Sequence, residues 1–118
     1  MIRTMLKGKV HNAVVTEADL NYEGSLTLDE TLMNAADMRP FEQIDVLNIT
    51  NGERFSTYLI KGKKDSGIVG VNGAAAHKAN PGDRIIIVSY SLMEDVDIEF
   101  FRPKIVLVGE DNTIKEIK

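Results

Sequence analysis

The groups in this chain that could do chemistry are hydroxyls, phenols and a small number of cationic side chains. The 118 residues include no cysteine and only two histidines, His11 and His77. Without cysteine there can be no disulfide framework, thiolate zinc site or cysteine nucleophile, and two histidines are too few for an all-histidine metal site. We therefore expect no resident metal.

The segment Asn21–Thr27 places a Gly-Ser pair, Gly24 and Ser25, between the end of one strand-like region and the start of the next. A Gly-Ser pair met in isolation is usually a surface turn, because glycine adopts backbone conformations that other residues avoid. The pair by itself therefore indicates no chemistry, and only the rest of the sequence can change that interpretation.

Lys9 and His11 stand two residues apart in a strand-like segment, so their side chains share one strand face. The net charge is −4, and an acidic protein that binds an anion must concentrate its cations locally. Further along, Asn72 opens the run Asn-Gly-Ala-Ala, which predicts a tight turn whose small side chains leave N–H groups accessible to a carboxylate. Ordinary roles stay open here: solvent-exposed strand residues for Lys9 and His11, and a helix cap for Asn72.

The segment Arg54–Tyr58 carries a guanidinium, two hydroxyls and a phenol. Side chains alternate along a strand, which puts Arg54 and Tyr58 on one face and Thr57 on the other. Either a twist or bulge reorients these residues, or a site draws them from neighbouring subunits. Taken alone, Thr57 suits a strand by its β-branching, Tyr58 suits a half-buried strand aromatic, and Arg54 suits a solvated charge beside a hairpin.

Short strands dominate the expected secondary structure. Asn-Gly at residues 51 and 52 is a strong hairpin signal between two strand-like runs. Asp29 is the expected N-cap of one short helix, residues 29–37, and residues 74–79 predict a further helical turn. The expected strands are residues 7–15, 42–50, 54–61, 67–71, 83–92, 103–108 and 113–117. This pattern predicts a mainly β fold, a small six- to seven-stranded barrel with one or two short helices.

Composition indicates one ordinary globular domain, residues 1–118. Hydrophobic residues make up 43% and charged residues 27%, which argues against disorder. The negative net charge argues against nucleic-acid binding, which needs a basic face. The first residues lack the apolar core of a signal peptide, and no apolar run reaches the roughly 18 residues of a membrane span. We expect a cytoplasmic protein without a membrane partner.

Four short motifs occur in order: Lys9-Val-His11, Tyr22-Glu-Gly-Ser25, Asn51-Gly-Glu-Arg-Phe-Ser-Thr-Tyr58 and Val71-Asn-Gly-Ala-Ala-Ala-His77. With the start Met-Ile-Arg-Thr-Met-Leu, they resemble the aspartate 1-decarboxylase family, whose pyruvoyl-dependent members make β-alanine for pantothenate synthesis. The resemblance covers nearly the whole chain at matching spacings. It implies a double-psi β-barrel and a homotetramer of four α and four β chains with sites between subunits. It also implies a covalent pyruvoyl cofactor, with no metal and no pyridoxal phosphate.

The resemblance implies that Ser25 attacks the carbonyl carbon of Gly24, which converts the peptide bond to an ester. β-Elimination then cleaves the chain and leaves dehydroalanine, which hydrolyses to a pyruvoyl group and ammonia. Glycine suits position 24, because a residue without a Cβ lets the backbone take a strained turn. Thr57 matches the family residue that stabilises the oxyanion. The products would be a β chain of residues 1–24 and an α chain of residues 25–118.

The resemblance also implies the residues that act on L-aspartate, whose amine would form a Schiff base with the pyruvoyl ketone before the α-carboxylate leaves. Tyr58 matches the proton donor that quenches the resulting carbanion, and Arg54 matches the cation that binds a substrate carboxylate. Tyr22 matches a family pocket residue, whereas Leu47 stands where many relatives carry an aromatic. The implied substrate-binding residues are Lys9, His11, Arg54, Thr57, Asn72, Gly73, Ala74 and Ala75.

Two other functions stay open. A double-psi barrel also occurs in non-catalytic binding or assembly modules, and a self-processing enzyme of this kind could act on a different amino acid. The continuous apolar run Ile85–Val88 suits a strand buried on both faces. Such a strand needs cover on its outer face, so we expect the domain to bury surface against copies of itself.

Overall fold

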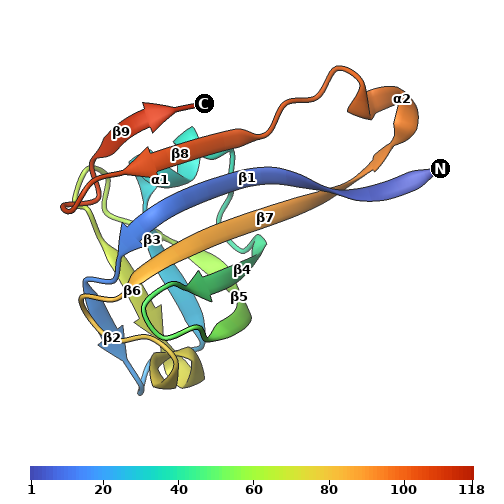
Figure 1. Cartoon of the computed structure of the whole chain (residues 1–118). Helices are drawn as coiled ribbons and strands as arrows, with labels where there is room; N and C mark the ends of the chain where they lie inside the picture. The colour runs from blue at the N-terminus through green and yellow to red at the C-terminus, as the bar shows by residue number, and fades with distance from the viewer.

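The computed structural model describes residues 1–118 as a mainly β fold with three short helical segments (Figure 1). The strands are β1 (Ile2–Val14), β2 (Glu17–Asp19), β3 (Ser25–Asp29), β4 (Gln43–Asn48), β5 (Arg54–Gly62), β6 (Val69–Asn72), β7 (Arg84–Glu94), β8 (Lys104–Val108) and β9 (Ile114–Ile117). The helical segments are α1 (Glu30–Ala35), the 3₁₀-helix η1 (Gly73–His77) and α2 (Asp95–Ile98). No helix among them has the length and apolar character needed to span a membrane.

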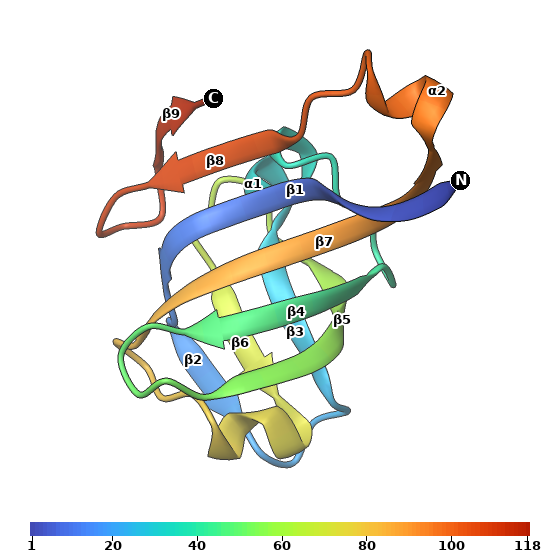
Figure 2. The ribbon, with the colours of Figure 1, turned by 45° about the vertical axis from the view of Figure 1, so that its right-hand side comes forward.

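All nine strands belong to one sheet with the order β2-β6-β3-β5-β4-β7-β1-β8-β9. Figure 2 shows how the sheet coils: β1, β7 and β4 run side by side at the front, and β3 and β6 cross behind them. The two end strands of this order, β2 and β9, each pair with a single neighbour. The sheet therefore wraps around one interior without closing edge to edge.

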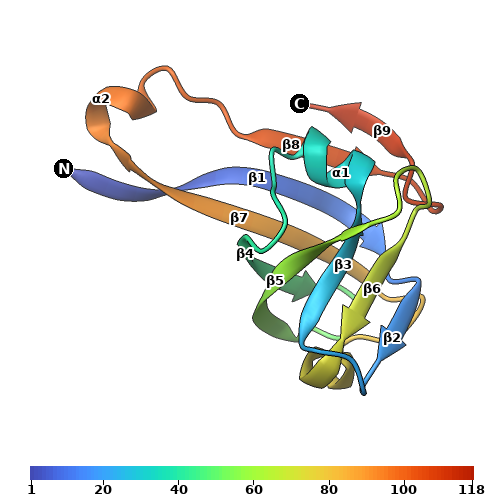
Figure 3. The ribbon, with the colours of Figure 1, turned by 180° about the vertical axis from the view of Figure 1, so that it is seen from behind.

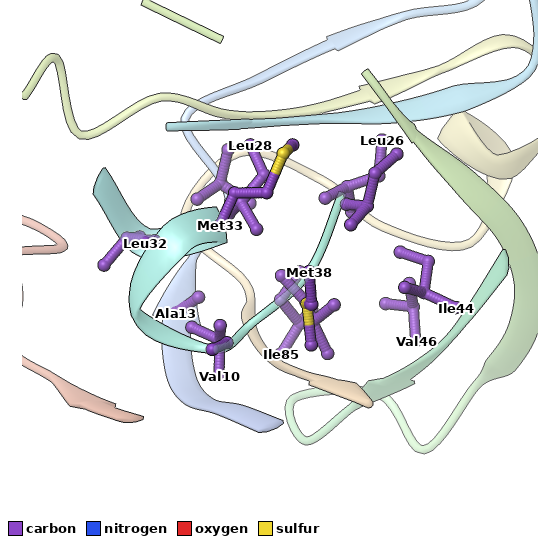
Figure 4. Packing of buried hydrophobic residues seen from close by; sticks show 14 of the residues in the cluster. Val10, Ala13, Leu26, Leu28, Leu32, Met33, Met38, Ile44, Val46 and Ile85 are labelled. Carbon is purple, nitrogen blue, oxygen red and sulfur yellow. The ribbon is translucent and has the colours of Figure 1, made fainter. Parts of the chain in front are cut away.

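A cluster of 19 buried residues fills this interior, and its members are aliphatic side chains and methionines. Figure 4 shows the side chains of Leu26, Leu28, Ile44 and Ile85 within the cluster. Each is at most 1% exposed, and burying such a side chain contributes about 1.5–3 kcal/mol. Because alternate strand residues supply the cluster, this burial also fixes which face of each strand points outward.

The expected helix cap and hairpin are confirmed. The carboxylate of Asp29 accepts a hydrogen bond from the N–H of Thr31 at 2.8 Å and starts α1. β4 and β5 pair antiparallel on either side of the turn that contains Asn51 and Gly52. Gly52 has a φ of +80°, a backbone conformation that glycine adopts without a steric penalty.

The mainly β fold with short helices is confirmed, but the sheet has nine strands rather than six or seven. β2 and β3 are not among the expected strands, although the sequence placed the start of a strand-like region after Ser25. Both pair with β6, which lies more than 40 residues along the chain, and local sequence does not reveal such pairing. β1 and β7 are also longer than predicted and extend together beyond the core as an arm, with α2 beside its end (Figure 3).

Candidate functional site

Ser25 is the first residue of β3 and is fully buried. Antiparallel pairing of β3 with β6 sets it opposite Asn72. The Ser25 hydroxyl donates to the carbonyl oxygen of Glu23 at 2.9 Å and accepts from Nδ2 of Asn72 at 3.0 Å. Two polar partners thus hold the hydroxyl directly beside the peptide bond that it would attack.

Asn72 ends β6 and is only 7% exposed. Asn72 is the N-cap residue of η1, but its side chain makes no capping hydrogen bond. The carboxamide points instead toward β3, where Nδ2 donates both to Ser25 Oγ and to Oγ1 of Thr27, each at 3.0 Å. The side chain therefore belongs to the surroundings of Ser25 rather than to the helix.

Gly73 packs directly against the Gly24 peptide. A Cβ at position 73 would lie 2.6 Å from the Cα and 2.7 Å from the nitrogen of Gly24, and 3.0 Å from the carbonyl oxygen of Tyr22. Its φ is also +70°, so glycine is required twice, for space and for conformation. This contact brings the start of η1 against the segment that precedes β3 (Figure 2).

A cavity of about 250 Å³ opens beside the Gly24–Ser25 junction. It is lined by Gly24, Phe55, Ser56, Thr57, Ala74, Ala75 and Lys78. Pockets for drug-sized ligands measure roughly 300–1,000 Å³, so this cavity suits a smaller molecule. Four of the expected site residues, Gly24, Thr57, Ala74 and Ala75, therefore meet around one space although they come from three separate segments.

Tyr58 does not line this cavity. β5 pairs with β4 in a continuous register from Arg54 to Tyr58, so no bulge reorients its side chains. Phe55 packs against the core and Leu59 is buried in it, which puts Thr57 on the inward face and Tyr58 on the outward one. Of the possibilities that the sequence left open (a twist, a bulge, or a site shared between subunits), the bulge is excluded within this chain.

Lys9 and His11 lie on the outward face of β1, three strands away from β5. Pairing aligns His11 with Ile86 of β7, Ile86 with Leu47 of β4, and Leu47 with Arg54 of β5. Three strand spacings amount to roughly 14 Å. Within one chain, the structure thus groups Lys9, His11, Arg54 and Leu47 on one outer sheet face but does not bring them to the cavity.

His11 is the one titratable candidate whose electrostatic surroundings stand out. Its Nδ1 is buried and has no hydrogen-bond partner. Burial of the ring, followed by the positive charges of Lys9 and Lys118, lowers the pKa of His11 from its ordinary value of 6.5. The lowered pKa favours the neutral ring at pH 7.

Two contact residues were missed by the sequence analysis, Thr27 and Lys78. Thr27 accepts a hydrogen bond from Asn72. Residues two apart in a strand share a face, so an expected strand over residues 25–29 would have placed Thr27 beside Ser25. Lys78 lines the cavity, and its Nζ lies 3.5 Å from a carboxylate oxygen of Glu53. No sequence signal marks Lys78, because distant residues position it: its carbonyl oxygen accepts hydrogen bonds from the side chains of Asn48 and Asn51. Tyr22 lies two residues before Gly24, and 52% of its surface is exposed.

Comparison with known proteins supplies an independent line of evidence. The family model described as aspartate decarboxylase matches residues 1–115. A protein of Ralstonia nicotianae named aspartate 1-decarboxylase is 55% identical over 118 residues, which is 100% of this chain and 98% of the relative. Proteins of the same name from Cupriavidus necator and Polynucleobacter asymbioticus are 54% and 57% identical over the same shares. The chain therefore belongs to the aspartate decarboxylase family.

Proposed function

We propose that this protein cleaves itself between Gly24 and Ser25 and then decarboxylates L-aspartate to β-alanine and carbon dioxide, the step that supplies pantothenate synthesis. The observation that carries the proposal is the buried Ser25 hydroxyl, held by Asn72 beside a glycine peptide that faces a small cavity. Family membership and the names of the relatives support the decarboxylation of aspartate. The cytoplasmic location expected from the sequence forms part of the same proposal.

Self-cleavage begins when Oγ of Ser25 bonds to the carbonyl carbon of Gly24 and the amide nitrogen of Ser25 leaves that carbon. Negative charge develops on the carbonyl oxygen of Gly24 during this shift. Thr57 lines the same cavity as Gly24, and, following the family match, we assign its hydroxyl the role of donor to this oxygen. Elimination then takes the Cα proton of residue 25 and expels the carboxylate of Gly24, which separates the chains.

The fit of a pyruvoyl group can be judged from the surroundings of residue 25. A Cβ built on Gly24 would meet nothing within 4 Å, so the end of the β chain has room to move away after cleavage. Asn72 remains as a hydrogen-bond donor beside residue 25. When formed, the group supplies a carbonyl that accepts electrons from the substrate. Ala74 and Ala75 line the cavity, and their N–H groups would bind a substrate carboxylate.

The remaining predicted residues belong to the proposal through a second copy of the chain. Lys9, His11, Arg54 and Tyr58 face outward on the coiled sheet, away from the cavity of their own subunit. Ile86 lies among them and is only half-buried, so a neighbouring surface that covers this face would also bury apolar area. We propose a homotetramer in which this face of one subunit packs against the Gly24–Ser25 cavity of the next. Lys9 and Arg54 have no carboxylate partner within their own chain and would bind the two carboxylates of aspartate.

The test begins with intact mass spectrometry of purified protein after prolonged warming. Two fragments, residues 1–24 and residues 25–118 with a blocked N-terminus, are expected, and Ser25→Ala should stay whole. Release of carbon dioxide from L-aspartate, with L-glutamate as the comparison substrate, then tests the reaction. A wild-type chain that remains uncut, or cleaved protein that prefers L-glutamate, contradicts the proposal.

A further inference from the structure

We infer that Thr27 is a positioning residue for self-cleavage, whose hydroxyl holds the Asn72 carboxamide in the orientation that donates to Ser25. The inference rests on the proposed self-cleavage and extends it to a residue outside the motifs. It starts from the two hydrogen bonds of Asn72 Nδ2, to Ser25 Oγ and to Thr27 Oγ1, both 3.0 Å long. A carboxamide nitrogen carries two hydrogens, so these two hydroxyls use its full donor capacity.

Strand geometry explains why Thr27 is able to do this. Thr27 follows Ser25 by two residues in β3, so both hydroxyls stand on the same strand face. The cross-strand partner of Thr27 is Gly70 of β6, and a Cβ at position 70 would lie 3.5 Å from the Thr27 Cβ. That spacing is an ordinary van der Waals contact, so the Thr27 side chain packs directly over the β6 backbone at Gly70. Because β3 pairs with β5 on one side and β6 on the other, Thr27 Oγ1 is fixed on a rigid element.

Burial makes the orientation of the carboxamide matter. Ser25 is fully buried and Asn72 is 7% exposed, so an N–H that loses its partner there has no ready replacement. If the Thr27 hydroxyl is removed, one N–H of the Asn72 carboxamide has no acceptor. The carboxamide then rotates toward another acceptor, and the N–H that donates to Ser25 moves away from Ser25 Oγ. Ser25 Oγ would then keep only its bond to the carbonyl of Glu23. Since an intramolecular attack depends on holding the reacting atoms close together, the acyl shift slows.

The experiment follows the first-order cleavage of freshly made full-length precursor, produced by cell-free synthesis, by intact mass. Thr27→Val keeps the shape of the side chain but removes the acceptor, and we expect cleavage to slow by about five- to tenfold. Thr27→Ser restores the hydroxyl and is expected to stay within about twofold of wild type. The matched control is Thr113→Val, which also removes a threonine hydroxyl bonded to a side chain, that of Asp111 at 2.6 Å, and should cleave at the wild-type rate.

A double-mutant cycle separates positioning from a general loss of stability. In an Asn72→Ala background, the change Thr27→Val should cause no further slowing, because the carboxamide through which it acts is absent. Equal rates for wild type and Thr27→Val, or equal slowing by Thr27→Val with and without Asn72, overturn this inference alone. A wild-type precursor that never cleaves overturns the proposed function and this inference with it.

Discussion

The ring of Tyr58 lies against the ring of Phe41, with centroids 6.4 Å apart and ring planes inclined by 31°. Phe41 is 79% exposed and has a φ of +71°, in the left-handed region that bulky side chains rarely occupy. Its N–H donates to the carbonyl of Leu59 at 2.7 Å. An exposed aromatic residue is thus held in a strained backbone conformation over the phenol that we assign to protonation.

Replacing Phe41 by Asn should relax the backbone and loosen Tyr58 together. Asparagine tolerates a positive φ better than phenylalanine, so the melting temperature should stay unchanged or rise. Loss of a ring contact worth about 0.5–1.5 kcal/mol should lower kcat by about two- to tenfold, while the extent of self-cleavage stays complete. Phe100→Asn, at a position that is 82% exposed and outside any aromatic pair, is the control. A fall in self-cleavage that parallels the fall in kcat would contradict this prediction.

Replacing Tyr58 by Phe should separate the two reactions. The phenylalanine ring retains the contact with Phe41 but lacks the acidic hydroxyl. Self-cleavage should proceed normally, because Tyr58 faces away from the cavity that contains Gly24. Carbon dioxide release should fall by about 10²–10⁴-fold, the usual contribution of a general acid. Intact mass and turnover are measured on the same preparation, and equal loss of both activities would show that the role of Tyr58 is misassigned.

Replacing Gly73 by Ala should block self-cleavage through packing. The new Cβ would lie 2.6 Å from the Cα of Gly24, which forces η1 and the Gly24 peptide apart. Gly52→Ala is the matched control, because Gly52 also has a positive φ, +80°, but no atom within 4 Å of a built Cβ. Both variants carry backbone strain of order 1–3 kcal/mol, and both are compared by urea unfolding. Only Gly73→Ala should leave the chain whole by intact mass, and equal cleavage in the two variants would count against the contact.

Mixed assemblies test whether a site is shared between subunits. Ser25→Ala chains retain Tyr58 but form no pyruvoyl group. Tyr58→Phe chains form the pyruvoyl group but lack the phenol. If the outer sheet face of one subunit serves the cavity of the next, co-expression should yield hybrid tetramers in which part of the sites are complete. Carbon dioxide release should then exceed that of either variant alone. Hybrids of the expected mass that are no more active than the separate variants would contradict a shared site.

Local signals in the sequence predicted a large part of this fold. The Asp29 cap and the hairpin at Gly52 depend on neighbouring residues, and so does the alternation that separates Thr57 from Tyr58. The sequence indicated a strand-like start after Ser25 but not the pairing of β3, because its partners β5 and β6 come much later in the chain. The cavity was likewise out of reach, because Gly24, Thr57 and Ala74 meet only after three distant segments pack. The family resemblance named Gly24, Thr57 and Ala74, but the distances between their atoms depend on strand register, which the sequence does not show.

The pH dependence of stability follows from the sign of the His11 pKa shift. Burial and then the charges of Lys9 and Lys118 lower the pKa of His11 below 6.5 in the folded state. The unfolded chain therefore takes up a proton at a higher pH than the folded one. The contribution of neutral His11 to the free energy of unfolding is fully present above about pH 6.5. It is lost as the pH falls through the lowered pKa of His11 in the folded state.

Replacing His11 by Gln should remove this part of the acid sensitivity, since glutamine does not titrate. We expect the free energy of unfolding of the Ser25→Ala precursor to fall less between pH 7.5 and 5.5 (about one unit either side of the ordinary histidine value) when His11 is replaced. Urea unfolding at each pH measures this difference, and NMR titration of the ring reports the pKa directly. Lys9→Gln should raise the pKa of His11 more than Lys118→Gln, because Lys9 exerts the larger of the two charge effects. A ring that titrates at or above 6.5 in the folded precursor would mean that the buried Nδ1 is solvated after all, and the predicted pH dependence would be lost.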